Sequence, residues 1–290
     1  MPVAATIGVR NHSATKRMPI TITFDLEDNR RTHDQPERFV VMSERFLEFL
    51  DRHHAKATVF VVGELGRTHP RLIRRFAQEG HEIGLHGLRH VPLEQVGRER
   101  LRDELREGRA LLEQAAQVPV RGFRAPIFSL TPRTAWAREE IKAAGFSYSS
   151  SVLPAANPLH GWPGVPRTPF KWPNGLIELP CPVAGVGRAM LPYLGGLYLR
   201  YVPRWVTSRL LARTDTDAIA WTYVHPYDMD VEEPFFTLPH AGWLTSRLLH
   251  TRRGVTLRRL EHLLTVAGGA APPLGERVAA LIAQDLPVVV

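Results

Sequence analysis

Two histidines, His86 and His90, stand four residues apart in the segment HGLRH. At this spacing both imidazoles can face one point from a single helical turn or tight loop. Neutral imidazole is a common ligand of borderline divalent metals, and two histidines leave the charge and coordination of such an ion incomplete. Asp25, Glu27 and Asp28 follow a β-branched run upstream and offer the missing carboxylate. The pattern predicts a site for one divalent metal.

Further polar residues could supply acid–base chemistry beside that metal. One carboxylate of the acidic cluster could act as a base, and the late His225, in the segment YVHP, could act as a general acid. Arg124, in the segment FRAP, is a third polar group at the end of a short apolar run. Together these residues describe a metal-dependent hydrolase.

Hydrophobic patterning places these residues directly after different predicted strands. Alternation of strands and helices predicts a parallel β/α architecture, in which polar groups meet at the carboxyl ends of the strands. We therefore expect Asp25, His86, Arg124 and His225 to share one rim. The strands are expected at 19–24, 57–62, 82–85, 120–123, 146–149, 176–179 and 218–224, and the helices at 39–53, 70–80, 93–117, 132–144, 203–213, 255–265 and 274–284.

Composition limits the classes of protein to which the chain can belong. With 290 residues, of which 44% are hydrophobic, it is long enough for a single domain over 19–290, after a leader over 1–18 that we expect to be disordered. The net charge of +8 comes from arginines scattered among acids, a pattern that does not favour nucleic-acid binding. Cys181 is the single cysteine, so no intrachain disulfide can form.

The sequence also bears on location. It contains neither the apolar core of a signal peptide nor about 18 consecutive apolar residues, so a cytoplasmic protein is expected. The segment 194–211 is apolar and carries three arginines. It is interpreted either as a peripheral contact with the inner membrane or a lipid-linked glycan, or as an ordinary packed helix and loop.

Seven segments together resemble the polysaccharide deacetylase superfamily, also called the NodB-homology or carbohydrate esterase family 4 superfamily. The match extends over roughly residues 20 to 265 and is most similar to the intracellular branch associated with exopolysaccharide gene clusters. The segments are TFDLED (23–28), GHEIGLHGLRH (80–90), RGFRAPIFS (121–129), AGFSYSSS (144–151), GLIELP (175–180), GGLYLRYVP (195–203) and YVHPYDMD (223–230).

The resemblance implies an α/β fold, a distorted (β/α)7-type barrel, and one divalent metal, commonly zinc. By position Asp25 matches the catalytic base, His86 and His90 match metal ligands, Arg124 matches the arginine that orients the base, and His225 matches the general acid. Many members have two adjacent aspartates, the second being a ligand. Here two residues separate Asp25 from Asp28, so that the third ligand could be Asp28 or Glu27.

The function expected from this resemblance is removal of N-acetyl groups from amino sugars of a bacterial exopolysaccharide or its lipid-linked precursor. A same-fold amidohydrolase acting on a ureide or cyclic amide is a second hypothesis, and an inactive glycan-binding protein is a third. Aromatic residues between the fifth and last strands could form a platform for sugar rings or could pack in the core. They are Trp162, Trp172, Tyr193, Tyr198 and Tyr201.

Overall fold

The computed structural model describes residues 18–30, 32, 34–156, 160–185, 190–215, 217–237 and 242–290. The predicted leader therefore lies outside the described residues, apart from Met18.

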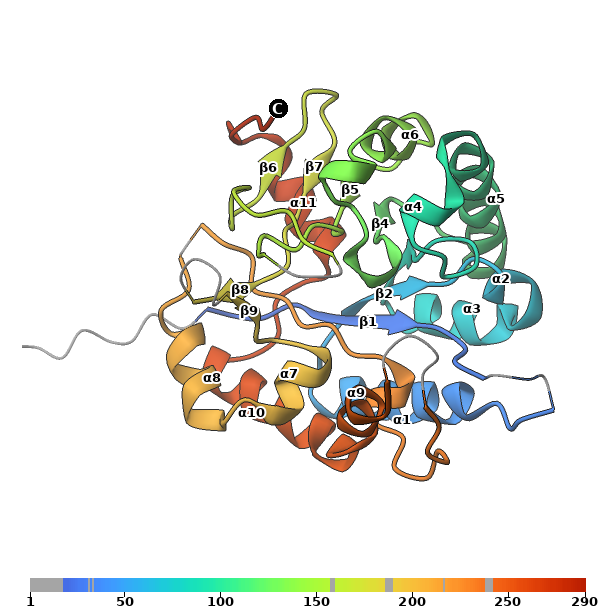
Figure 1. Cartoon of the computed structure of the whole chain (residues 1–290), viewed down its shortest axis with the longest axis vertical. Helices are drawn as coiled ribbons and strands as arrows, with labels where there is room; N and C mark the ends of the chain where they lie inside the picture. Colours follow the sequence, from blue (N-terminus) through green and yellow to red (C-terminus); the bar gives the residue numbers. More distant parts are fainter. Residues whose placement is uncertain are drawn as a thin grey trace, which may run out of the picture.

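A seven-stranded sheet forms the centre of the molecule (Figure 1). Its order is β1-β2-β3-β4-β5-β7-β6, and all neighbours are parallel except the last pair, in which β6 runs antiparallel to β7. The predicted alternating architecture is confirmed, with strands shorter than expected in the second half. The strands are β1 (Ile22–Leu26), β2 (Ala57–Val61), β3 (Glu82–Leu85), β4 (Gly122–Phe123), β5 (Tyr148–Ser149), β6 (Phe170–Lys171) and β7 (Ile177–Glu178).

The free side of β1 is covered by the segment that was predicted as the last strand, 218–224. This segment makes isolated parallel bridges, Thr21 with Trp221 and Phe24 with Val224, instead of a continuous strand. The bridges continue the sheet beyond β1 and bring His225 beside the end of that strand. A separate antiparallel pair, β8 (Val183–Ala184) and β9 (Leu191–Pro192), lies outside the main sheet.

Helices surround the sheet, and most of them follow the predicted ranges. The long helix predicted over 93–117 is instead two helices, because Gly97 adopts φ +79° and breaks the chain into α4 and α5. The helices are α1 (Arg38–Arg52), α2 (Leu65–Thr68), α3 (Pro70–Gln78), α4 (Leu93–Val96), α5 (Arg98–Ala116), α6 (Ala137–Ala143), α7 (Gly196–Tyr201), α8 (Arg204–Leu211), α9 (Gly242–His250), α10 (Thr256–Ala267) and α11 (Leu274–Ile282). Within the described residues, no helix is long and apolar enough to cross a bilayer.

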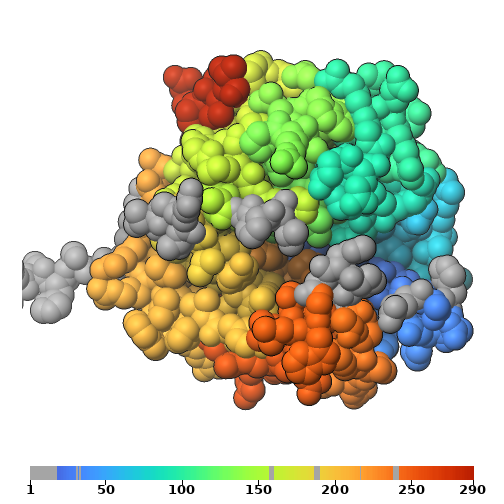
Figure 2. All heavy atoms as spheres, in the orientation of Figure 1, coloured from blue at the N-terminus to red at the C-terminus, as the bar shows by residue number. Residues whose placement is uncertain are grey.

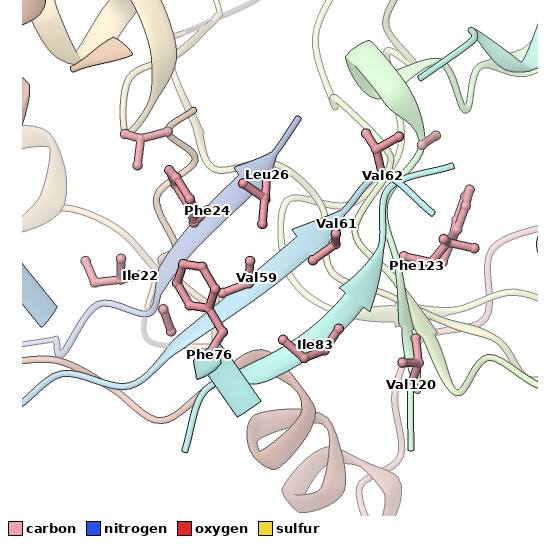
Figure 3. Close-up of a cluster of buried hydrophobic side chains, with 14 of the residues drawn as sticks. Ile22, Phe24, Leu26, Val59, Val61, Val62, Phe76, Ile83, Val120 and Phe123 are labelled. Carbon is pink, nitrogen blue, oxygen red and sulfur yellow. The ribbon is translucent and has the colours of Figure 1, made fainter. Parts of the chain in front are cut away.

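The two faces of β1 have different roles. Ile22, Phe24 and Leu26 are fully buried and belong to a cluster of buried apolar side chains with Val59, Val61 and Phe76 (Figure 3). In this cluster Phe24 also stacks on Phe46 of α1, with ring centroids 4.3 Å apart. Successive side chains of a strand point to opposite faces, so Thr23 and Asp25 face the interior of the barrel. Asp25 thus lies within β1, one residue before the strand ends at Leu26, whereas the sequence pattern placed it one residue after the strand end.

Candidate active site

Three side chains that could hold a metal ion converge at the carboxyl ends of β1 and β3. Glu27, His86 and His90 each offer a ligand atom, and these atoms all lie within 4.8 Å of one another. The Nε2 atom of His90 is 2.8 Å from Oε2 of Glu27, while the rings of His86 and His90 have centroids 5.0 Å apart. One carboxylate and two imidazoles are a donor set typical of zinc, with coordination positions left for water and substrate.

The loop after β3 gives the two histidines their relative position. His86 directly follows the strand, and its backbone N–H donates to Val61 of β2. Gly87 then adopts φ +70°, where a Cβ would lie only 3.0 Å from Pro126. His90 itself is left-handed, with φ +56°, a conformation uncommon outside glycine. The i, i+4 spacing therefore acts through a tight loop and not through a helical turn.

The ring of His86 is oriented by Arg124. Its Nδ1 atom lies 3.0 Å from the backbone carbonyl oxygen of Arg124, and the ring is 2% exposed. If Nδ1 carries the proton and donates to this carbonyl, Nε2 is left as an unprotonated ligand atom, which is the usual arrangement of a metal-binding histidine. Burial lowers the pKa of His86 to about 4, so the neutral ligand form predominates at neutral pH.

Glu27 and His90 stabilise each other's charged forms. Burial by itself would raise the pKa of Glu27, but the nearby His90 outweighs burial and the pKa is about 2. Burial likewise opposes the charged form of His90, yet Glu27 raises its pKa above the usual value. Oε2 of Glu27 is buried and has no hydrogen-bond donor of good geometry, so its nearest partner is the ion pair with His90. A divalent cation would satisfy such an oxygen.

The sequence left Asp28 and Glu27 as alternatives for the carboxylate ligand, and the structure places the two side chains apart. Asp28 forms a forked ion pair with Arg30, with Nη2 of Arg30 2.8 Å from Oδ2. It lines a different cavity, together with Arg38 and Phe39 of α1. The geometry therefore favours Glu27, and Asp28 lies outside the cluster.

Asp25 and Arg124 form a buried pair beside the cluster. Nη1 of Arg124 donates to Oδ1 of Asp25 at 2.5 Å and to Thr23 Oγ1 at 2.8 Å, and the arginine has no exposed surface. Its other nitrogens donate to the carbonyl and hydroxyl oxygens of Ser150. These bonds fix the guanidinium, and through it one oxygen of Asp25.

His225 lines the same cavity as Arg124. Its Nε2 atom is 3.8 Å from Oδ2 of Asp25 and 4.0 Å from Oε1 of Glu27, and its ring stacks on Tyr227 at 4.6 Å. Asp25, Arg124 and His225 thus lie together with the cluster of Glu27, His86 and His90. The sequence predicted that the strand ends would bring these residues to one rim.

Asp228 and Arg200 are part of this site but were not identified from the sequence. Oδ2 of Asp228 is 2.8 Å from Nδ1 of His225, and Oδ1 is 3.1 Å from Nη2 of Arg200, with both Asp228 and Arg200 fully buried. Burial would lower the pKa of His225, but the hydrogen bond and charge of Asp228 raise it to about 9. The i, i+3 spacing of His225 and Asp228 around Pro226 was the available signal.

A cavity of about 290 Å³ is lined by the polar side chains of Asp25, Glu27, His86, His90, Arg124 and His225. Its walls include apolar side chains from the loop after β4 and from α7, namely Ile127, Phe128, Leu197 and Tyr198. Ile127 and Phe128 have φ +50° and +56°, strained values for residues with a side chain, and strain of this kind is common at functional sites. The site thus combines a polar floor with a partly apolar rim.

Only one member of the predicted aromatic platform lines this cavity. Tyr198 does so, whereas Trp172 and Tyr193 are buried and Trp162 packs on Trp172 with centroids 5.0 Å apart. Tyr201 lies under the guanidinium of Arg252. Most of these rings therefore pack in the interior, and the aromatic lining of the cavity comes from Tyr198 together with Phe128, Tyr223 and Tyr227.

Two family models match the chain. A model described as polysaccharide deacetylase matches residues 12–149, and one described as a domain of unknown function, DUF3473, matches residues 150–267. The first region contains Asp25, Glu27, both cluster histidines and Arg124. The second contains Arg200, His225 and Asp228, so the candidate site draws on both regions.

Curated relatives and solved structures agree with this match. A chitooligosaccharide deacetylase of Sinorhizobium fredii is 36% identical over 87 residues, 30% of this chain and 40% of the relative. A peptidoglycan-N-acetylglucosamine deacetylase of Bacillus cereus is 29% identical over 122 residues, 42% and 41% of the two chains. The match thus spans less than half the length of these relatives. A candidate polysaccharide deacetylase from Mycobacterium smegmatis superposes with a TM-score of 0.64 at 21% identity, covering 99% of this chain and 97% of its own, which shows a common fold.

Proposed function

The chain belongs to the polysaccharide deacetylase family through its residues 12–149, and from this premise we propose that it is a metal-dependent hydrolase of N-acetylated amino sugars. The observation that carries the proposal is the convergence of Glu27, His86 and His90 beside a buried carboxylate, Asp25, and a further histidine, His225. Such a set can activate water, hold an amide and protonate the amine that leaves.

The proposed ligands of the metal are Glu27 Oε2, His90 Nε2 and the Nε2 atom of His86. The close approach of their ligand atoms and the hydrogen-bond-deficient Glu27 Oε2 support this assignment. Zinc suits two imidazoles and one carboxylate. A divalent metal held there would polarise the amide carbonyl and lower the pKa of a bound water.

Asp25 is the proposed general base. Arg124 holds its Oδ1 atom, and Oδ2 remains directed toward the cavity, 3.8 Å from His225. A carboxylate fixed in this way can take a proton from water that lies between it and the amide. The role of Arg124 is then to hold Asp25 in position through the hydrogen bond to Oδ1.

His225 is the proposed general acid. Because Asp228 raises its pKa to about 9, the imidazole carries a proton at neutral pH and can donate it from Nε2. The amine of a cleaved amide is a poor leaving group until it is protonated, so the reaction needs this donor. Arg200 supports the arrangement through its ion pair with Asp228.

An N-acetylated glycan is the proposed substrate class, with a bacterial exopolysaccharide or its lipid-linked precursor as its source. The names of the curated relatives support a glycan, and the rim formed by Tyr198, Tyr227 and Leu197 offers faces on which a sugar ring can pack. A small ureide would not need such a rim.

Release of acetate tests the proposal. Purified protein loaded with one equivalent of zinc should release acetate and a free amine from N-acetylated chitooligosaccharides, while His86→Ala should not. Allantoin, as a representative ureide, should give no product. Turnover of allantoin without acetate release would instead establish the amidohydrolase hypothesis, and the absence of both activities would contradict an enzymatic role.

A further inference from the structure

Helix α9, Gly242–His250, exposes an apolar face to solvent. The exposed fractions of Trp243, Leu244 and Leu248 are 62%, 67% and 40%. At 100° per residue, these three side chains and Arg247 fall within 140° of the helix surface, and Ser246 on the opposite side is buried. Figure 2 shows α9 at the surface of the drawn face, in orange near its lower centre. A clustered exposed face of this kind marks an interaction surface.

Hydrogen bonds hold the C-terminal end of α9, although the outer face of the helix is exposed. The carbonyl oxygens of Leu249 and Thr251 accept hydrogen bonds of 2.9 and 3.0 Å from Nη1 of the buried Arg200. The next residues are fixed by Arg253, whose Nη1 pairs with Glu233 at 2.5 Å. The apolar side chains are therefore presented on a helix whose C-terminal end is anchored to α7.

The surroundings of this face are positively charged. Residues 234–260 contain five arginines and no acidic residue. Three acids precede this segment: Asp230 and Glu232 share Arg38, and Glu233 pairs with Arg253. Arg247, Arg252 and Arg258 therefore remain as the exposed arginines of this segment. Apolar and aromatic side chains beside arginine are the composition of helices that lie in the interface of an anionic bilayer.

We propose that α9, with Phe235 beneath Arg247, docks the protein on an anionic lipid surface. The guanidinium of Arg247 lies over the ring of Phe235, 5.2 Å from its centroid, so the apolar and cationic parts form one patch. Trp243 and Leu244 enter the headgroup region, and the arginines meet lipid phosphates. Association with lipid does not depend on the proposed deacetylation, and either can fail without the other.

The patch lies close to the candidate active site. Arg200, which holds the end of α9, belongs to α7, and α7 supplies Leu197 and Tyr198 to the cavity. Phe235 also lines a second cavity that shares Tyr227 with the first. Docking through α9 would therefore bring the cavity near the plane of the lipid headgroups. If the proposed function holds, glycans attached to lipid would be favoured substrates.

Sedimentation with vesicles tests the docking surface. The full chain should bind phosphatidylglycerol–phosphatidylcholine vesicles and lose binding as salt is raised, with weak binding to phosphatidylcholine alone. Trp243→Ser/Leu244→Ser should weaken partitioning by about tenfold or more. Arg247→Gln/Arg252→Gln should cost about fivefold for each arginine on anionic vesicles. Circular dichroism would verify that each variant is folded.

Two control variants distinguish binding through this surface from non-specific binding to vesicles. Ile282 is 61% exposed on α11, which begins beside Glu82 at the opposite end of the parallel strands, so Ile282→Ser should leave binding unchanged. Arg71→Gln/Arg133→Gln removes two exposed charges elsewhere and should have a smaller effect than the α9 pair. Equal binding by the wild type and the Trp243/Leu244 variant would overturn the proposal. So would a wild-type dimer that this variant dissociates without any vesicle binding, because the face would then join two copies of the chain.

Discussion

The Nε2 atom of His90 lies 2.8 Å from the Oε2 atom of Glu27 at the end of β1. Both are proposed metal ligands, and the ionised carboxylate of Glu27 favours the protonated form of His90. The raised pKa of His90 and the low pKa of Glu27 have this common origin. Metal binding must therefore displace the proton, which links metal affinity to pH.

The first prediction concerns this proton. Because His90 has a raised pKa, it is protonated below its usual value of 6.5, and a metal must compete with one proton there. Zinc affinity should fall about tenfold for each pH unit below 6.5 and become less dependent on pH above the raised pKa. Calorimetry in two buffers of different ionisation enthalpy should show about one proton released per metal at low pH. Affinity independent of pH between 5 and 6.5 would contradict the assignment of His90.

Glu27→Gln and Asp28→Asn form a matched pair for the carboxylate ligand. Glu27→Gln removes the charged oxygen that faces both histidines, so metal affinity should drop at least about 100-fold. Asp28→Asn affects only the ion pair with Arg30 and should keep one equivalent of metal. Metal analysis after gel filtration measures both. Loss of metal from Asp28→Asn with retention in Glu27→Gln would reverse the assignment.

Arg124→Lys tests the positioning of Asp25. Alanine is a poor choice, because removing one partner of a buried ion pair costs about 3–5 kcal/mol. Lysine keeps a positive charge but loses the fork that reaches Asp25, Thr23 and Ser150. Turnover should fall roughly 10- to 100-fold while metal content stays at one equivalent. The exposed Arg121→Lys is the control, and comparable losses in both variants would deny Arg124 a specific role.

Asp228→Asn should impair the proposed general acid. The charge of Asp228 keeps the pKa of His225 raised, and without it burial lowers that pKa. Since the protonated form is the active one, the alkaline limb of the turnover–pH profile should move to lower pH. Asp215→Asn, an exposed carboxylate, should leave the limb in place. An alkaline limb that does not move in Asp228→Asn would show that His225 does not set it.

His225→Ala should affect chemistry more than substrate binding. Loss of a general acid lowers the rate by about 10²–10⁴-fold with little change in KM. An activated acetyl ester, whose leaving group needs no proton, should be affected much less than the N-acetyl substrate. Equal losses on both substrates would assign His225 a structural or metal-positioning role.

Much of the fold could be predicted because the strands carry strong local patterns. Continuous apolar runs identified β2 and β3, and the residue following β3 is His86, as expected. The segment 218–224 has an equally strong pattern, yet it forms only isolated bridges to β1, since strand pairing depends on the neighbour and not on the segment alone. Gly97 divided a predicted helix because its positive φ is a feature that helical periodicity does not reveal.

The site was predictable in its members and less so in its geometry. Residue types and order indicated the histidines, Asp25, Arg124 and His225, but both Glu27 and Asp28 had the right chemistry. Asp28 lies apart from Glu27 because its carboxylate pairs with Arg30. The alternation of side chains along β1 directs Asp25 toward the barrel interior. Arg200 of α7 pairs with Asp228, which is 28 residues away in the sequence. A contact of this kind depends on tertiary packing and cannot be predicted from a local sequence pattern.

Titration of metal-free protein tests the central claim most directly. Protein stripped of metal should release no acetate from an N-acetylated chitooligosaccharide, and activity should rise linearly with added zinc to an end point at one equivalent. Glu27→Gln, titrated in parallel, should stay inactive at that point. Full acetate release by the stripped protein, or by Glu27→Gln at one equivalent of zinc, would contradict hydrolysis at a single metal held by Glu27, His86 and His90.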